Sequence, residues 1–379
     1  MRIGMFKKNQ SLALLFFTHV IFGSENLPVI RLAPPRIEQE YIDKHVTCIR
    51  PGRNGRFNLA AEIKDNTLLV HNYGASGAGW TLLFGLVQES INQLESMIEK
   101  NPIYQNQPVC VIGAGCMGLL TAILLQERGY NVRIVAEQIE DLTSHTAGGF
   151  FSGNSSLKNA KTVQEKNFVG NVWIESYNFY KSIAQGLHPL FSKDCARFIP
   201  YFVGKNTESY IEFYVGLGLM QPPLPVIIDF GTGTQREMKQ YSTFFIDVLK
   251  MMERMHDLID QKNIDIQQQF VASFDDVPES IIFNCSGLGS KELAGDDQVL
   301  PVQGHLIMLK NQPTLEYVIY EEFESVDQNG NVIEDYFYYI PKEQGLLGGT
   351  FIKHEGSLTS NHHEFARILD RAADYFGVK

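Results

Sequence analysis

Ten consecutive residues determine which fold class this chain adopts: Val109-Cys-Val-Ile-Gly-Ala-Gly-Cys-Met-Gly118. A short apolar run comes first, and a segment with helical apolar spacing follows the glycines as far as Gly129. This context predicts a strand, a tight turn and a helix. In such a loop Gly113 makes the turn, Gly115 lets the backbone approach a pyrophosphate, and Gly118 allows the helix to pack closely on the strand.

An acidic residue supports the same interpretation. The next apolar run, residues 132–135, leads to Glu137, which lies 19 residues after Gly118. A carboxylate at this place accepts hydrogen bonds from ribose hydroxyls, while the helix N-terminus offers backbone amides to the phosphates. The sequence therefore predicts a site for an adenine dinucleotide, although this loop by itself suits FAD and NAD equally.

Similar elements surround the loop. Residues 67–71 form a β-type run, a glycine-rich turn follows, and residues 80–98 have helical apolar spacing. The region from about residue 150 to 240 is rich in aromatic residues, which indicates a substrate domain. We further predict strands over 225–230, 280–284, 303–309 and 336–341, and helices over 241–262 and 363–376.

Composition limits the function classes. The chain has 379 residues, 44% of them hydrophobic, which suffices for two packed domains. Its formal net charge is -11, and it has no run of Lys or Arg, which argues against a nucleic-acid partner. The five cysteines are scattered, and no His accompanies them at metal-ligand spacing, so we expect neither a metal site nor a disulfide framework.

The N-terminus has the outline of a secretory signal peptide over residues 1–24. Basic residues precede an apolar stretch, residues 12–22, and small residues follow it. Thr18 and His19 interrupt the stretch, so an N-terminal helix is the alternative. With a cleaved signal the protein would be periplasmic or secreted, and otherwise it would be cytoplasmic. We predict no stable membrane span after processing, because no other stretch approaches the about 20 apolar residues that cross a bilayer.

Further motifs are spread over most of residues 109–376. They are Val132-Arg-Ile-Val-Ala-Glu-Gln138, Leu142-Thr-Ser-His-Thr-Ala-Gly-Gly-Phe-Phe151, Asn284-Cys-Ser-Gly-Leu-Gly289, Pro301-Val-Gln-Gly-His-Leu-Ile307, Tyr338-Tyr-Ile-Pro341 and Leu347-Gly-Gly-Thr-Phe351. Together these motifs resemble the D-amino-acid oxidase family of FAD-dependent oxidoreductases: its second strand, its flavin-contacting loop, its return strand with the strand after it, and its substrate-side hairpin.

The order of the motifs differs from that of the family. Cys48-Ile-Arg-Pro-Gly-Arg53 and His71-Asn-Tyr-Gly-Ala-Ser-Gly-Ala-Gly-Trp-Thr81 resemble its closing motifs, yet both precede the nucleotide loop. We therefore expect a circular permutant in which residues 101–107 join the old ends. The new ends would fall between the C-terminal helix and the segment of Arg50. Such a rearrangement is physically mild, because domain termini often lie close together.

The architecture expected from these patterns is α/β: a Rossmann-type FAD-binding domain with an antiparallel-sheet substrate domain, circularly permuted. The FAD-binding domain would comprise residues 60–150 and 236–300. The substrate domain would comprise residues 25–59, 151–235 and 301–379.

The resemblance also implies how a substrate is held, and it makes Arg50 and Tyr338 the candidate catalytic residues. Arg50 would clamp the substrate carboxylate with two parallel hydrogen bonds, a geometry that a guanidinium supplies. Tyr338 matches the carboxylate-binding tyrosine of the family. Glu334 stands where the family has a second tyrosine, which leaves the side-chain specificity open. Tyr336 could replace that tyrosine, because it shares a strand face with Tyr338.

Two groups of residues are expected to bind FAD. A helix N-terminus near Trp80 would stabilise the negative charge of reduced flavin. Ser76 and Gly77 stand where the family commonly has two adjacent glycines, so the backbone there is expected to differ slightly. The group from the nucleotide loop and its acidic partner is Gly113, Ala114, Gly115, Met117, Gly118 and Glu137. The group around the pyrophosphate and the ring is Thr143, Ser144, Gly148, Gly149, Ser76, Gly77, Gly79 and Thr81.

The activity implied by the resemblance is oxidation of a D-amino acid to a keto acid, ammonia and hydrogen peroxide, with FAD as cofactor and oxygen as electron acceptor. Three alternatives stay open: an amino-acid dehydrogenase that passes electrons to a quinone, a glycine or sarcosine oxidase-like enzyme on the same fold, and a flavin-binding protein without turnover. The partners expected are a small amino-acid substrate and oxygen. A homodimer is compatible with the sequence.

Overall fold

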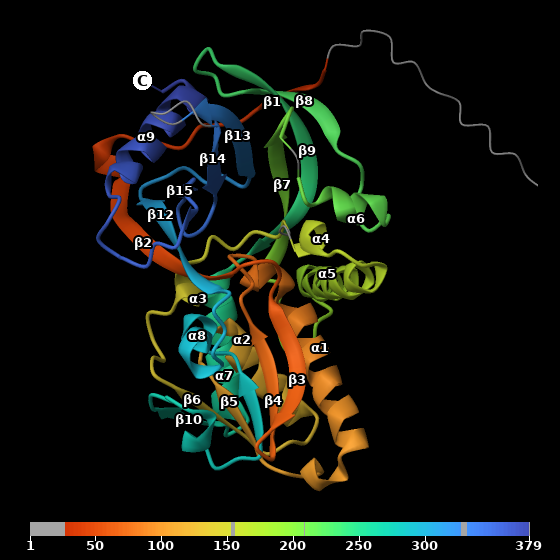
Figure 1. Ribbon diagram of the computed structural model, residues 1–379. Coiled ribbons are helices and arrows are strands. Elements are labelled where there is room, and N and C mark those ends of the chain that lie inside the picture. Colours follow the sequence, from red (N-terminus) through yellow and green to blue (C-terminus); the bar gives the residue numbers. More distant parts are fainter. Residues whose placement is uncertain (1–26, 153–155, 208, 327–331, 379) are drawn as a thin grey trace, which may run out of the picture.

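The computed structural model describes residues 27–152, 156–207, 209–326 and 332–378. It is built around a six-stranded and a ten-stranded sheet, which occupy the lower and upper halves of Figure 1. The predicted signal peptide, residues 1–24, lies outside the described residues. Within the described ranges, none of the helices combines the length and the apolar character needed to cross a bilayer.

The six-stranded sheet carries the nucleotide loop. Its neighbouring strands are parallel except at one edge, where β3 pairs antiparallel with β4. All four residues of β5 are buried, as expected for a parallel strand that is covered on both faces. In spatial order the strands are β10 (Asp265–Gln268), β6 (Val132–Ala136), β5 (Val109–Ile112), β11 (Ile281–Asn284), β4 (Thr67–Tyr73) and β3 (Asn58–Lys64).

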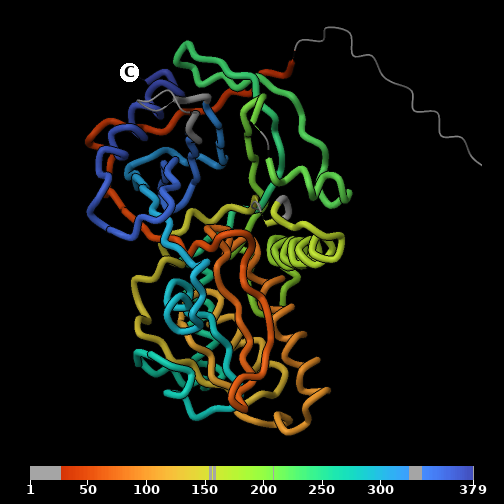
Figure 2. Tube along the Cα trace, viewed as in Figure 1, coloured from red at the N-terminus to blue at the C-terminus, as the bar shows by residue number. Residues whose placement is uncertain are grey.

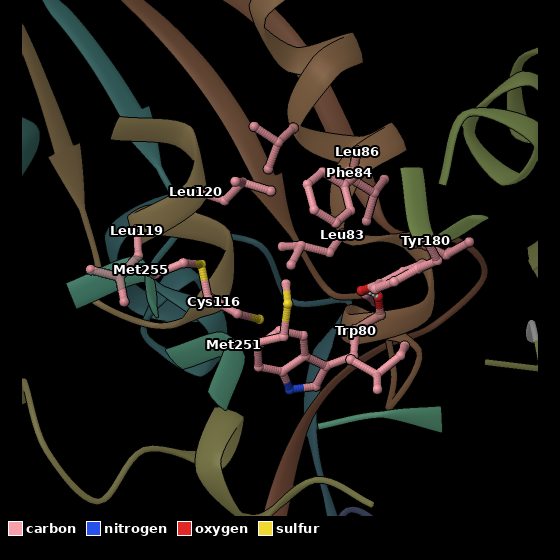
Figure 3. Packing of buried hydrophobic residues seen from close by; sticks show 14 of the residues in the cluster. Trp80, Leu83, Phe84, Leu86, Cys116, Leu119, Leu120, Tyr180, Met251 and Met255 are labelled. Atoms are coloured by element: carbon pink, nitrogen blue, oxygen red, sulfur yellow. Dashed lines mark hydrogen bonds between the residues drawn. The ribbon is translucent and has the colours of Figure 1, made fainter. Parts of the chain in front are cut away.

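Three helices cover one face of this sheet: α1 (Gly79–Lys100), α2 (Cys116–Glu127) and α7 (Val248–Gln261). Val109 and Val111 of β5 belong to the same buried cluster as these helices, whereas Cys110 and Ile112 pack on the opposite face. Figure 3 shows the interior of the helical layer, where side chains of α2 meet those of α1 and α7. The labelled residues of these helices are Trp80, Leu83, Phe84, Leu86, Cys116, Leu119, Leu120, Met251 and Met255.

The ten-stranded sheet is mainly antiparallel, with parallel pairs at β1–β8 and β7–β13. Strand β2 (Ile42–Arg53), which carries Arg50, pairs antiparallel with β12 from end to end, so an early segment of the chain is hydrogen-bonded to a late one. The other strands in spatial order are β1 (Val29–Arg31), β8 (Leu224–Asp229), β9 (Gln235–Ile246), β7 (Ala196–Gly204), β13 (Val318–Val326), β14 (Val332–Ile340), β15 (Leu346–Gly348), β12 (Val299–Leu309) and β16 (Ile352–Lys353).

The C-terminal helix α9 (His363–Phe376) has the predicted bounds and packs its apolar residues into the second buried cluster of the sheet. Helix α5 (Val163–Ala184) lies beside α1, and the Tyr180 hydroxyl of α5 donates to the Trp80 carbonyl of α1. The remaining helices are short: α3 (Thr143–Thr146), α4 (Ser156–Asn159), α6 (Glu212–Gly216) and α8 (Ser290–Leu293).

Two predictions of local structure were wrong or incomplete. The helix predicted over residues 241–262 begins only at Val248, because Asp247 caps it by accepting a hydrogen bond from the Lys250 amide at 3.1 Å. The residues before this cap continue strand β9. The sequence analysis also missed α5, although Thr162 and Glu165 form a capping box that the sequence displays.

The division into two domains stays a prediction. Strand β9 places residues 235–246 in the ten-stranded sheet, whereas that division assigned residues from 236 onward to the FAD-binding domain.

Candidate active site

The nucleotide loop has the predicted strand, turn and helix geometry. Strand β5 ends at Ile112, Gly113 has a φ of 112°, and α2 begins at Cys116. A Cβ on Gly118 would lie 1.8 Å from the carbonyl oxygen of Gly113, so only glycine lets α2 come this close to the turn. Gly118 therefore acts through packing. Of the predicted cofactor residues, it alone does not line the cavity described next.

A cavity of about 1380 Å³ extends from this loop to the ten-stranded sheet. The N-termini of α1, at Gly79, and of α2, at Cys116, both open onto it. Helix N-termini carry partial positive charge, which favours a phosphate or an anionic ring. The predicted cofactor residues that line the cavity are Gly113, Ala114, Gly115, Met117, Glu137, Thr143, Ser144, Gly148, Gly149, Ser76, Gly77, Gly79 and Thr81.

The nucleotide end of the cavity fits the adenosine diphosphate part of FAD. A Cβ on Gly113 would lie 2.5 Å from the Cys285 carbonyl oxygen, so only glycine fits at this turn, which is the turn that precedes a pyrophosphate site in dinucleotide-binding loops. Glu137 is exposed at the end of β6 and lines the cavity, in the place of a carboxylate that binds ribose hydroxyls.

Ser144 connects the flavin-contacting loop to both helix N-termini. Its hydroxyl oxygen accepts a hydrogen bond from the Cys116 amide, at 3.1 Å. Its carbonyl oxygen accepts one from the indole N–H of Trp80, at 3.0 Å. The starts of α1 and α2 are thus held at fixed positions on one loop. The sequence analysis predicted Ser144 but not the contribution of the Trp80 side chain.

Lys342 also holds the flavin-contacting loop in place. It is buried, and its ammonium group donates to the carbonyl oxygens of His145, at 2.5 Å, and Ala147, at 3.0 Å. Burial lowers the pKa of Lys342 to about 8. Lys342 follows β14, so the strand that carries Tyr338 also anchors the loop of the flavin ring. The sequence analysis missed this residue, because a lysine beside a glutamate is typical of a surface turn.

Arg50 lies at the substrate end of the cavity, and two glycines make room for it. A Cβ on Gly304 would lie 2.5 Å from both Nη atoms of Arg50, and one on Gly77 would lie 3.1 Å from its Cδ. The Nη1 group donates to the carbonyl oxygens of Thr350, at 3.1 Å, and Gln303, at 3.4 Å. A guanidinium has five N–H donors, so donors remain for a carboxylate.

Tyr338 lies beside Arg50, as the resemblance implied. Its ring covers Gly348, where a Cβ would lie 2.3 Å from the hydroxyl oxygen. Burial raises the pKa of Tyr338, although the nearby charge of Arg50 opposes the shift, so the hydroxyl is neutral at neutral pH. Tyr336 shares this face of β14, as predicted, and the two rings stack with centroids 6.2 Å apart.

Two further cavity residues were missed by the sequence analysis: Tyr320 and Glu322 of β13. They lie directly opposite Tyr338 and Tyr336 of β14, and the Tyr320 hydroxyl donates to Glu322 Oε1 at 2.8 Å. Strand alternation in residues 318–326 was an available signal, but the pairing of the two strands is a tertiary property. The side chain of Glu334 is not among those that the structure describes.

The sequence of this chain is similar to those of known FAD-dependent enzymes. Residues 108–215 match the family model described as FAD dependent oxidoreductase. A D-amino-acid oxidase of Dictyostelium discoideum is 24% identical over 278 residues, which cover 69% of this chain and 71% of that protein. A D-amino-acid oxidase of Streptomyces coelicolor is 23% identical over 269 residues, which cover 70% of this chain and 76% of that protein.

Solved structures of flavoenzymes are also similar to this chain. The iminodiacetate oxidase of Chelativorans sp. BNC1 has 11% sequence identity and a TM-score of 0.46, over 71% of this chain and 79% of that chain. This likeness is distant. The matched family model covers the nucleotide loop, which has its predicted geometry, so residues 108–215 form a domain similar to those of FAD-dependent oxidoreductases, with FAD as the cofactor.

Proposed function

We propose that this enzyme oxidises a D-amino acid to a keto acid, ammonia and hydrogen peroxide. One observation carries the proposal: Arg50 and Tyr338 line the same cavity as the FAD loop. A guanidinium with donors to spare, beside a neutral hydroxyl, suits a carboxylate-bearing substrate. The names of the relatives from D. discoideum and S. coelicolor support an amino acid and the D configuration.

The protein residues act mainly by orienting the substrate. Arg50 binds the carboxylate through two parallel hydrogen bonds, and the Tyr338 hydroxyl donates a third. With the carboxylate fixed, the α-hydrogen is held toward the ring site that Gly77 and Gly79 border. The N-terminus of α1 places partial positive charge beside that site.

Bound FAD supplies the hydride acceptor, and dioxygen then takes up the two electrons and two protons as hydrogen peroxide. The amino group loses a proton as the hydride leaves, so the first product is an imino acid, which water converts to keto acid and ammonia. Lys342 keeps the flavin-contacting loop in place during these steps, because its two hydrogen bonds fix the backbone of residues 145–147.

The test is to mix the purified flavoprotein without oxygen with D- and L-alanine, D-aspartate, D-lysine and glycine, and to record bleaching of the flavin. Oxygen or an artificial electron acceptor is then admitted. We expect D-amino acids to bleach the flavin and oxygen to restore the colour with release of hydrogen peroxide. Colour restored only by the artificial acceptor would indicate a dehydrogenase. A flavin that no amino acid bleaches would contradict the proposal.

We also propose that the chain is a circular permutant of its family. Its two described ends meet at one hairpin, which supports a former connection there: Arg31 of β1 pairs with Asp229 of β8, while the Phe376 carbonyl of α9 accepts from the Thr232 hydroxyl. Figure 2 shows the red and blue ends of the trace in the same part of the molecule. The segment that would join the old ends, residues 101–107, includes a short 3-10 helix, Pro102–Tyr104.

A reordered gene tests the permutation. Residues 108–378, a short flexible linker and residues 27–100 would be expressed as one chain. We expect this chain to fold and to retain FAD, because every strand pairing can be kept. Failure to bind FAD with linkers of several lengths would contradict the permutation. The domain boundaries and the export signal stay proposals too, and the mass of the N-terminal peptide of the mature protein tests the latter.

A further inference from the structure

We infer that the enzyme prefers amino acids with a cationic side chain, which Glu322 binds; this inference rests on the proposed oxidation of an amino acid. The observations that carry it are a carboxylate that has no ion-pair partner among the described residues, its position beyond the Arg50 and Tyr338 pair, and the tyrosine rings beside it.

We expect the side chain of a substrate held by Arg50 to extend along the sheet face toward Glu322. Three side chains of β14 lie in order along one face of the strand. Ile340 lies against Gly148 of the flavin-contacting loop, and Tyr338 lies next to Arg50. Tyr336 lies two residues further along the strand, away from that loop. Glu322 stands directly opposite Tyr336 on the neighbouring strand, which Figure 1 shows beside β14. Directly opposed residues share one face of the sheet, and both of these line the cavity.

The spacing suits a long side chain. Two residues along an antiparallel strand span about 7 Å. The opposed pair Tyr336 and Glu322 therefore lies about this far along the sheet from the opposed pair Tyr338 and Tyr320. A flexible four-carbon stem, as in lysine, reaches across such a step when its carboxylate is bound by Arg50 and Tyr338. A methyl side chain ends well before it.

The charge of Glu322 is available to a ligand. In the described part of the chain its carboxylate accepts a hydrogen bond from the Tyr320 hydroxyl and takes part in no ion pair. A carboxylate has about four acceptor sites, so this bond leaves capacity for an ammonium or guanidinium. Asp335 also lines the cavity, but Arg367 and Arg371 both bind it, Arg367 at 2.6 Å.

The surroundings of Glu322 favour a cation as well. The ring centroids of Tyr336 and Tyr320 lie 5.9 Å apart. Because Tyr336 lies opposite Glu322 and Tyr320 donates to it, two aromatic rings lie close to the Glu322 carboxylate. Aromatic faces attract ammonium and guanidinium groups. Burial raises the pKa of Tyr320, with a further contribution from Glu322, so Tyr320 stays a neutral donor that orients the carboxylate. An acidic side chain would instead be repelled at this end of the cavity.

The test compares lysine, alanine and glutamate, each in the configuration that the enzyme oxidises. Steady-state kinetics are measured on full-length wild-type holoenzyme and on Glu322→Gln. We expect the wild type to have a higher kcat/KM for lysine than for glutamate. In Glu322→Gln, kcat/KM for lysine should fall about tenfold more than that for alanine, mainly through KM, since one charge-assisted hydrogen bond is lost.

Two more variants make the result decisive. Glu316→Gln removes a carboxylate that pairs with Arg197 outside the cavity and should leave the lysine-to-alanine ratio unchanged. Glu322→Lys should invert the preference, so that glutamate becomes the better substrate of the two charged ones. Equal losses for lysine and alanine in Glu322→Gln would overturn the inference while leaving the proposed function intact. A flavin that none of the three amino acids bleaches would overturn both.

Discussion

The two ends of the cavity are built in different ways. At the nucleotide end, residues 112–117 line the cavity as one continuous stretch that includes two glycines. At the substrate end, side chains from three strands meet: Arg50 on β2, Tyr338 on β14 and Glu322 on β13. Atoms added at Gly113 or Gly118 would therefore meet fixed backbone, whereas the substrate end can be altered one side chain at a time. The following predictions test this difference.

The largest effect is expected at the nucleotide end. Gly118→Val would place side-chain atoms against the Gly113 carbonyl oxygen, which already lies 1.8 Å from the Cβ position. Helix α2 would have to move, at a cost of about 3 kcal/mol in the free energy of unfolding, and FAD would be lost. Flavin content and urea unfolding measure both effects. Gly216→Ala, which meets no atom within 4 Å, is the matched control and should change neither.

A glycine substitution at the substrate end should separate binding from cofactor retention. Gly304→Ala adds a Cβ at 2.5 Å from both Nη atoms of Arg50, so the guanidinium must shift. We expect KM for the amino acid to rise about tenfold or more, because the carboxylate clamp loses its alignment. FAD content should stay at the wild-type level. Loss of FAD without a change in KM would show that the two ends are not built independently.

The smallest effect concerns Lys342, which connects the two ends. Its pKa of about 8 in the folded protein lies below its ordinary value of 10.5. The unfolded chain therefore keeps a proton that the folded protein releases, and this group makes stability rise with pH above about 8. Relative to Lys342→Met, the free energy of unfolding of the wild type should increase by about 1 kcal/mol from pH 8 to 9. Urea unfolding at both pH values checks this, and a constant difference would contradict it.

The same contrast explains what the sequence could predict. The nucleotide loop, strand β5 and helix α2 follow from local spacing, because glycines and apolar residues act on their immediate neighbours. Arg50 and Tyr338 were assigned by resemblance alone, because no local pattern shows that β2 pairs with β12 beside β15 and β14. Glu322 was missed for the same reason. Its place in the cavity depends on the register between β13 and β14, which only the folded sheet defines.

In the proposed reaction, both ends of the cavity act on one bound pair, FAD and a carboxylate held by Arg50. The most direct test is anaerobic reduction of the flavin by the best amino acid in wild-type protein and in Arg50→Ala. The account predicts that Arg50→Ala retains FAD and needs roughly 100-fold more substrate for half-maximal bleaching, because the carboxylate loses a bidentate charged partner. Bleaching of Arg50→Ala at wild-type substrate concentrations would contradict it.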